Sequence, residues 1–154
     1  MIDIVLINTT RSKNIPSQKQ FDRWVNTALN CLSRKNNIKD AAQITITIVG
    51  EKKSAALNQA FRDKTGPTNI LSFTYPVIKK IRSSSLGDLV ICANLVKKEA
   101  LFQKTNIQNH WAHLTVHGVL HLLDYDHLHD KEARIMEALE IRILKQLDIE
   151  NPYV

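Results

Sequence analysis

The segment from Ile107 to His127 reads IQNHWAHLTVHGVLHLLDYDH. Its apolar residues recur at helical spacing, and the acidic segment 124–126 then predicts a turn. At about 100° per residue, the histidines at positions 110, 113, 117 and 121 share one face of this helix. The turn brings His127 back toward that face. The sequence therefore predicts an H-x3-H-x5-H unit, built from a helix and the turn after it.

This unit predicts a metal site with His117, His121 and His127 as ligands. Three neutral imidazoles leave one position of a tetrahedral zinc ion open, which is typical of catalytic rather than structural sites. Water in that position loses a proton near neutral pH and becomes a nucleophile. We expect one zinc-class ion per chain, although three histidines also suit nickel, cobalt or copper. The other histidines are expected to be surface or hydrogen-bonded structural residues: His110, His113 and His129.

Metzincin proteases use the same ligand spacing, in the pattern H-E-x-x-H-x-x-G-x-x-H. Gly118 stands here at the position of their catalytic glutamate. A glycine can neither take nor return a proton, so peptide hydrolysis by the usual route is disfavoured. We expect Gly118 instead to let the helix approach a neighbouring element closely.

The remaining periodicities predict an α/β (α+β) fold with four short strands and about five helices. Ser17 is the predicted N-cap of the first helix, and Gly87 is predicted to introduce the last strand. The expected strands are 2–7, 43–48, 69–75 and 88–93, and the expected helices are 21–32, 53–64, 94–104, 107–123 and 130–147.

Length and composition narrow the class of protein. A chain of 154 residues that is 44% hydrophobic predicts one compact domain over residues 1–154. Cys31 and Cys92 form no C-x-x-C pair, which argues against a zinc ribbon or a disulfide framework and favours a reducing compartment. The sequence lacks a run of about 18–20 apolar residues, and it begins with Met1-Ile2-Asp3 rather than with a basic signal. We expect a soluble, unprocessed, cytoplasmic protein with no membrane partner.

The charge of the chain is unevenly distributed. The net charge is +6, but residues 1–105 hold 17 basic and 7 acidic side chains, whereas residues 106–154 hold 4 and 8. A basic region attracts polyanions over about a Debye length, so nucleic acid is the first partner to consider. A solvated surface with no such partner would explain the charge equally well.

The segment His117–His127 resembles the signature H-G-x-L-H-L-x-G-[YH]-D-H of the YbeY family of rRNA-maturation endoribonucleases, and ten of its eleven positions agree. The departure is Asp124, where the family has glycine. Aspartate tolerates a left-handed backbone better than most residues, so we expect the turn to be kept, with an extra carboxylate that could perturb the metal. Three more segments are similar to the family: 58–73, 86–92 and 136–153.

The resemblance implies a mixed four-stranded sheet flanked by helices, one zinc ion, and cleavage of single-stranded RNA. It further implies a role in 3′-end maturation of small-subunit ribosomal RNA and in ribosome quality control. The expected partners are therefore ribosomal RNA and the ribosome or its small subunit. The functionally important arginine of the family falls on Arg62. A guanidinium there can fork onto two phosphate oxygens and stays charged, although a solvated helix residue is the alternative.

Other roles near this site remain open from the sequence. Asp126 could orient an imidazole or relay a proton, but a bond to local backbone that holds the turn is favoured. Asp88 has the same ambiguity, and Ser72 is placed in the cleft by analogy only. Exposed cations are expected to follow the RNA backbone without reading bases. These are Lys52, Lys53, Lys64, Lys79, Lys80 and Arg82.

The predicted function is a zinc-dependent endoribonuclease with His117, His121, His127 and Arg62 as its catalytic residues. Two alternatives compete with it. One is a zinc hydrolase of another class, such as a metalloprotease, and the other is a non-enzymatic ribosome-assembly factor whose metal only stabilises the fold.

Overall fold

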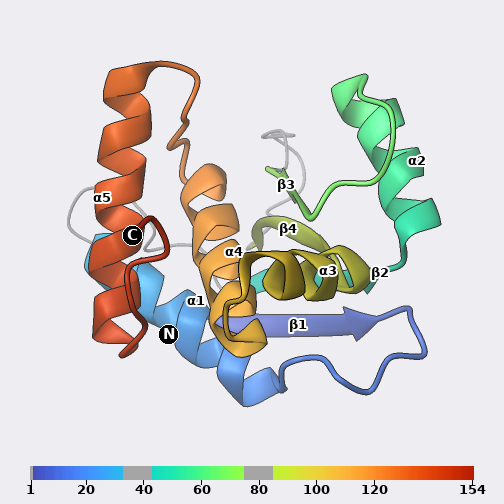
Figure 1. Cartoon of the computed structure of the whole chain (residues 1–154), viewed down its shortest axis with the longest axis horizontal. Helices are drawn as coiled ribbons and strands as arrows, with labels where there is room; N and C mark the ends of the chain where they lie inside the picture. Colours follow the sequence, from blue (N-terminus) through green and yellow to red (C-terminus); the bar gives the residue numbers. More distant parts are fainter. Residues whose placement is uncertain (1, 33–42, 75–84) are drawn as a thin grey trace.

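The computed structural model describes residues 2–32, 43–74 and 85–154. These residues form four strands and five helices (Figure 1). In chain order they are β1 (Asp3–Asn8), α1 (Gln18–Leu32), β2 (Gln43–Val49), α2 (Glu51–Arg62), β3 (Ile70–Phe73), β4 (Ser85–Cys92), α3 (Ala93–Gln103), α4 (Ile107–Leu122) and α5 (Asp130–Gln146). Among the described residues, no helix has the length and apolar character that a membrane crossing requires.

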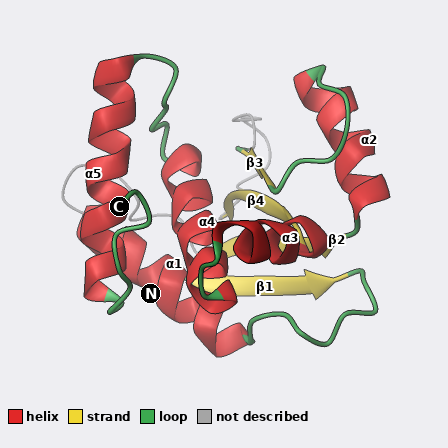
Figure 2. Cartoon of the chain, viewed as in Figure 1, coloured by secondary structure: helices red, strands yellow, loops and turns green. Residues whose placement is uncertain are grey.

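The strands form one mixed sheet in the order β1-β2-β4-β3. β1, β2 and β4 run parallel, and β3 pairs antiparallel with β4 at the edge. Parallel neighbours need a crossover connection, and α1 lies in the connection between β1 and β2. Figure 2 shows the helices arranged around these strands. The mixed four-stranded sheet with five flanking helices confirms the predicted fold class.

The core lies where α4 meets the sheet and the helices α1 and α5. Ile44, Ile46 and Ile48 alternate along β2 and are fully buried, as the period of two along a strand requires. Phe21 of α1 packs edge-on against Trp111 of α4, with ring centroids 6.1 Å apart. Most of α4 is buried, and Figure 1 shows it passing through the middle of the molecule. The helix that carries His117 and His121 is therefore held in the core along most of its length.

The N-terminus of α1 follows the sequence prediction. The hydroxyl of Ser17 accepts a hydrogen bond from the backbone N–H of Gln20 at 3.2 Å. The Gln20 side chain accepts the N–H of Ser17 at 2.9 Å in return. This reciprocal pair is a capping box, which satisfies two N–H groups at the helix start.

α2 begins and ends two residues earlier than predicted. Asp63 adopts a left-handed backbone (φ 54°) and donates its N–H to Gln59, while Lys64 donates to the carbonyl of Asn58. This arrangement closes the last turn at Arg62. A helix end formed by aspartate rather than glycine carries a weaker sequence signal, which explains the misplaced boundary.

Gly87 lies inside β4 instead of introducing it, because the strand begins at Ser85. The pairing of β2 with β4 shifts register at this point, as in a β-bulge, and Gly87 has φ 149°. A Cβ atom here would collide with the carbonyl oxygen of Phe73 and would lie 2.7 Å from Leu122 Cδ2. The predicted residues beyond β3, Tyr75 and the basic segment 79–82, lie outside the described residues.

Candidate metal centre

The three predicted ligands meet at the C-terminal end of α4. His117 and His121 are one helical turn apart, and their Nε2 atoms lie 3.0 Å from each other. His127 follows the turn, and its ring centroid lies 5.6 Å from that of His117 and 5.2 Å from that of His121. One ring nitrogen from each residue falls within 4.8 Å of the others, so the cluster could hold a metal ion. The helix and turn thus bring the three imidazoles together as predicted.

The turn that returns His127 is fixed by backbone hydrogen bonds. Tyr125 donates its N–H to the carbonyl of Leu120 at 3.1 Å, and Asp124 donates to His121 at 3.1 Å. Asp124 has φ 67°, the left-handed conformation that glycine favours, and its side chain is exposed. Aspartate therefore occupies this glycine position without disrupting the turn.

Asp126 supports the same turn. Its Oδ1 atom accepts the backbone N–H of His127 at 2.7 Å. The distance from that oxygen to Nδ1 of the His127 ring is 3.8 Å, which is too long for a hydrogen bond. Of the roles considered for Asp126, the structure shows the bond to local backbone.

Glu140 of α5 is a site residue that sequence reasoning missed. Its side chain is fully buried, and Oε1 hydrogen-bonds to Nδ1 of His117. Oε2 lies 3.1 Å from Nε2 of His113 and accepts the hydroxyl hydrogen of Tyr153. With its Nδ1–H donated to the carboxylate, His117 keeps the lone pair of Nε2 for an ion. The available signal was position, because Glu140 interrupts the apolar stripe of α5 one turn after Met136.

The charge states of these groups suit a metal site. Burial opposes ionisation of Glu140, but hydrogen bonds from His113, His117 and Tyr153 outweigh it and lower its pKa to about 2. Burial and the neighbouring carboxylate raise the pKa of Tyr153, so its hydroxyl remains a donor. Burial, followed by the nearby His117 and His127 rings, lowers the pKa of His121. A neutral His121 is the form that binds metal.

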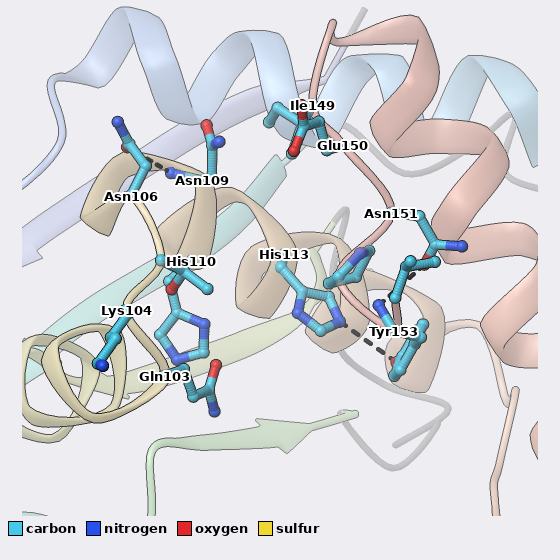
Figure 3. Close-up of a pocket in the computed structure, with 13 residues that line it drawn as sticks. Gln103, Lys104, Asn106, Asn109, His110, His113, Ile149, Glu150, Asn151 and Tyr153 are labelled. Atoms are coloured by element: carbon cyan, nitrogen blue, oxygen red, sulfur yellow. Dashed lines mark hydrogen bonds between the residues drawn. The ribbon is translucent and has the colours of Figure 1, made fainter.

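The remaining histidines are hydrogen-bonded or exposed, as expected. His110 is buried with Nε2 2.9 Å from Oε1 of Glu99, whose carboxylate also accepts from Asn69. Nε2 of His113 lies 3.1 Å from Oε2 of Glu140 and 3.3 Å from the hydroxyl oxygen of Tyr153. His113 and Tyr153 both line a cavity of about 520 Å³ (Figure 3). His129 is exposed at the start of α5.

Gly118 faces the sheet and permits a close approach of α4. A Cβ atom at this position would lie 2.7 Å from Cδ1 of Ile70 and 2.8 Å from Cδ2 of Leu89. These distances confirm the packing role that the sequence predicted. The glutamate that a metalloprotease carries at this position would have to displace both side chains.

Arg62, at the end of α2, is exposed and docks on β3. Its Nη2 atom donates to the carbonyl oxygen of Ser72 at 2.9 Å, and its guanidinium carbon lies 5.7 Å from the centroid of the Phe73 ring. The Ser72 hydroxyl donates to the carbonyl of Gly118 at 3.3 Å. Ser72 therefore connects Arg62 to the residue that follows His117.

The other predicted site residues lie in β4, on or next to α2, or outside the described residues. Asp88 lies in β4 opposite Phe73 of β3. Lys52, Lys53 and Lys64 are exposed on or next to α2. Lys79, Lys80 and Arg82 lie outside the described residues.

Comparisons with known proteins identify the family of this chain. The family model described as Endoribonuclease YbeY matches residues 6–148. A protein of Methylococcus capsulatus named Endoribonuclease YbeY is 46% identical over 153 residues, covering 99% of this chain and 96% of its own. A solution structure from Thermotoga maritima has the same fold at 20% identity, with a TM-score of 0.56 over 94% of this chain and 91% of that one. This chain belongs to the YbeY family of endoribonucleases.

Proposed function

We propose that residues 1–154 act as one metallo-endoribonuclease domain that cleaves single-stranded RNA with a zinc-class ion held by His117, His121 and His127. The observation that carries this proposal is the convergence of three ring nitrogens on one point, with Glu140 behind His117. Imidazoles backed by a carboxylate are typical zinc ligands. An ion of this class would supply Lewis acidity there and would lower the pKa of a water molecule bound to it.

The protein's own residues perform the other tasks of the reaction. Glu140 orients His117, and the turn held by Asp126 positions His127. Arg62 binds the phosphate group, because its guanidinium is exposed, permanently charged and anchored at one nitrogen by the Ser72 carbonyl. The remaining guanidinium N–H groups are available for non-bridging oxygens, where negative charge develops during cleavage.

We further propose that the substrate is ribosomal RNA, with roles in 3′-end maturation of the small-subunit RNA and in ribosome quality control. Membership of the YbeY family and a net charge of +6 support a polyanionic partner of this kind. The cytoplasm is the proposed compartment, since Cys31 and Cys92 are free thiols. The ribosome or its small subunit would supply sequence selection that a backbone-binding surface lacks.

The test uses a labelled single-stranded RNA with an unprocessed small-subunit rRNA 3′ end, alongside the same RNA annealed to its complement. We expect zinc-loaded protein to cleave the first and spare the second. A different result would indicate a non-enzymatic assembly factor: protein that is shown to hold zinc cleaves neither RNA, but the same protein binds to isolated small ribosomal subunits. Cleavage of a peptide library without RNA cleavage would indicate a metalloprotease.

The chemistry of the cut ends identifies the nucleophile. Cyclic phosphate ends would show attack by the 2′-hydroxyl of the RNA itself. Ends with a free 3′-hydroxyl and a 5′-phosphate would show attack by water. The proposed role of Arg62 applies to both routes, because each places extra charge on the same phosphate group.

A further inference from the structure

We propose that the exposed face of Phe61 is a stacking platform for a base of single-stranded RNA, next to the phosphate that Arg62 binds. This inference rests on the proposed function and adds a substrate contact to it. Arg62 and Phe61 are consecutive at the end of α2, so one would hold the backbone and the other a base of the same short RNA segment.

Phe61 is held in place but left open to solvent. Its ring packs edge-on against Phe73, with centroids 5.3 Å apart and planes at 70°. The residue nevertheless remains 61% exposed. An aromatic side chain that stays exposed forgoes the free energy that burial would provide. The edge-on contact with Phe73 also limits the rotation of the Phe61 ring. A rigid, accessible ring is the form in which proteins present aromatics to unpaired bases.

Phe73 joins the aromatic contact to the phosphate clamp. The Phe61 ring contacts Phe73, and the Arg62 guanidinium carbon lies 5.7 Å from the centroid of the same Phe73 ring. The two consecutive side chains are therefore supported by one residue of β3. An aromatic ring beside an anchored guanidinium matches a nucleotide, which offers a base and a phosphate side by side.

The position and charge of this surface favour RNA over a protein partner. Ser72, adjacent to Phe73, donates to the carbonyl of Gly118, and Gly118 directly follows His117. The platform is thus connected to α4 through two consecutive residues of β3, Phe73 and Ser72. The rest of α2 presents Lys52 and Lys53 as exposed cations, which complement a polyanion.

Tryptophan fluorescence tests this contact directly. Trp24 and Trp111 are 5% and 1% exposed, so they should respond little to an external base. In Phe61→Trp, we expect saturable quenching when zinc-loaded protein is mixed with a short 2′-O-methylated single-stranded RNA. The matched control is Phe102→Trp on α3, where the native residue is 89% exposed and is followed by Gln103 instead of arginine. Its fluorescence should stay unchanged.

The affinity of the protein for the same RNA provides a second test. We expect Phe61→Ala to raise Kd for this RNA by about fivefold or more, and Phe61→Tyr to keep it near the wild-type value. Phe102→Ala should leave Kd unchanged. Equal quenching in both tryptophan variants, no quenching in Phe61→Trp, or a wild-type Kd for Phe61→Ala would each overturn the proposal.

Cleavage by the wild-type protein, measured in parallel, separates this inference from the proposed function. RNA cleavage without a Phe61 effect would reject the stacking platform and leave the endoribonuclease proposal intact. Specific quenching of Phe61→Trp without any RNA cleavage would support the platform and reject the enzymatic proposal.

Discussion

Nδ1 of His117 hydrogen-bonds to Oε1 of Glu140, a carboxylate that has no exposure to solvent. The bond joins α4 to α5 across the core, and it leaves Nε2 of His117 directed toward His121. A ligand ring that is already oriented loses less freedom when an ion binds. The affinity of the metal centre should therefore depend on a residue that does not touch the ion.

Replacing Glu140 with glutamine should weaken metal binding about 10- to 100-fold, because the neutral amide no longer accepts strongly from His117, His113 and Tyr153. A competition titration against a chromophoric zinc chelator measures this change. Glu137→Gln, an exposed neighbour on the same helix, is the control and should bind zinc normally. Equal affinities in the two variants would show that Glu140 does not position the ligand.

Arg62→Ala should retain zinc but lower the RNA cleavage rate at least about a hundredfold, because it removes the donors that stabilise charge on the phosphate. Arg62→Lys should recover little, since an ammonium cannot fork onto two oxygens. Arg23→Ala, an exposed arginine of α1, controls for loss of positive charge. A normal cleavage rate for Arg62→Ala would refute the phosphate clamp.

Gly118→Glu introduces the glutamate that metzincin proteases carry at this position. We expect it to lower the free energy of unfolding by about 3 kcal/mol or more. The new side chain would enter the space of Ile70 and Leu89 and bury a charge. The gain in helix propensity is only about 1 kcal/mol, so the clash dominates. Gly50→Ser serves as control, because nothing lies within 4 Å of its Cβ position and serine is a good N-cap. Urea denaturation compares the variants, and a wild-type midpoint for Gly118→Glu would contradict this packing.

The Glu99–His110 pair should stabilise metal-free protein near neutral pH, and this stabilisation should be lost in acid. Burial opposes ionisation of Glu99, but hydrogen bonds from His110 and Asn69 lower its folded-state pKa below the ordinary 4.5. Its contribution is therefore complete above pH 4.5 and is lost as pH falls through the lower folded value. We expect the stability gap between wild type and Glu99→Gln to narrow from about pH 6 to about pH 3 in urea titrations. A gap that widens over this range would reverse the sign of the interaction.

The sequence predicted those features that depend on local pattern. The spacing of His117, His121 and His127 predicted that the three rings come together, because helical period and a following turn determine where they point. Alternation along residues 43–48 predicted β2 for the same reason. Gly118 predicted that α4 approaches a neighbouring element closely, because a residue without a side chain is itself a local signal.

Contacts between distant segments could not be predicted in this way. Glu140 lies 23 residues after His117, and their meeting depends on how α5 packs against α4. The bond from Arg62 to Ser72, and the support that Phe73 gives to Phe61, likewise depend on where α2 ends relative to β3. Gly87 was misplaced because a bulge inside a strand is defined by its partner strand, not by its own sequence.

Cleavage measured as a function of metal occupancy shows whether the three histidines hold an ion that the reaction needs. Metal-free protein is titrated with zinc while cleavage of single-stranded RNA and bound metal are measured on the same samples, with His121→Ala alongside. We expect cleavage to rise in proportion to bound zinc, to level off at one ion per chain, and to be absent in His121→Ala along with the metal. Full cleavage by metal-free protein, or by His121→Ala, would exclude a catalytic role for a metal ion at the three histidines.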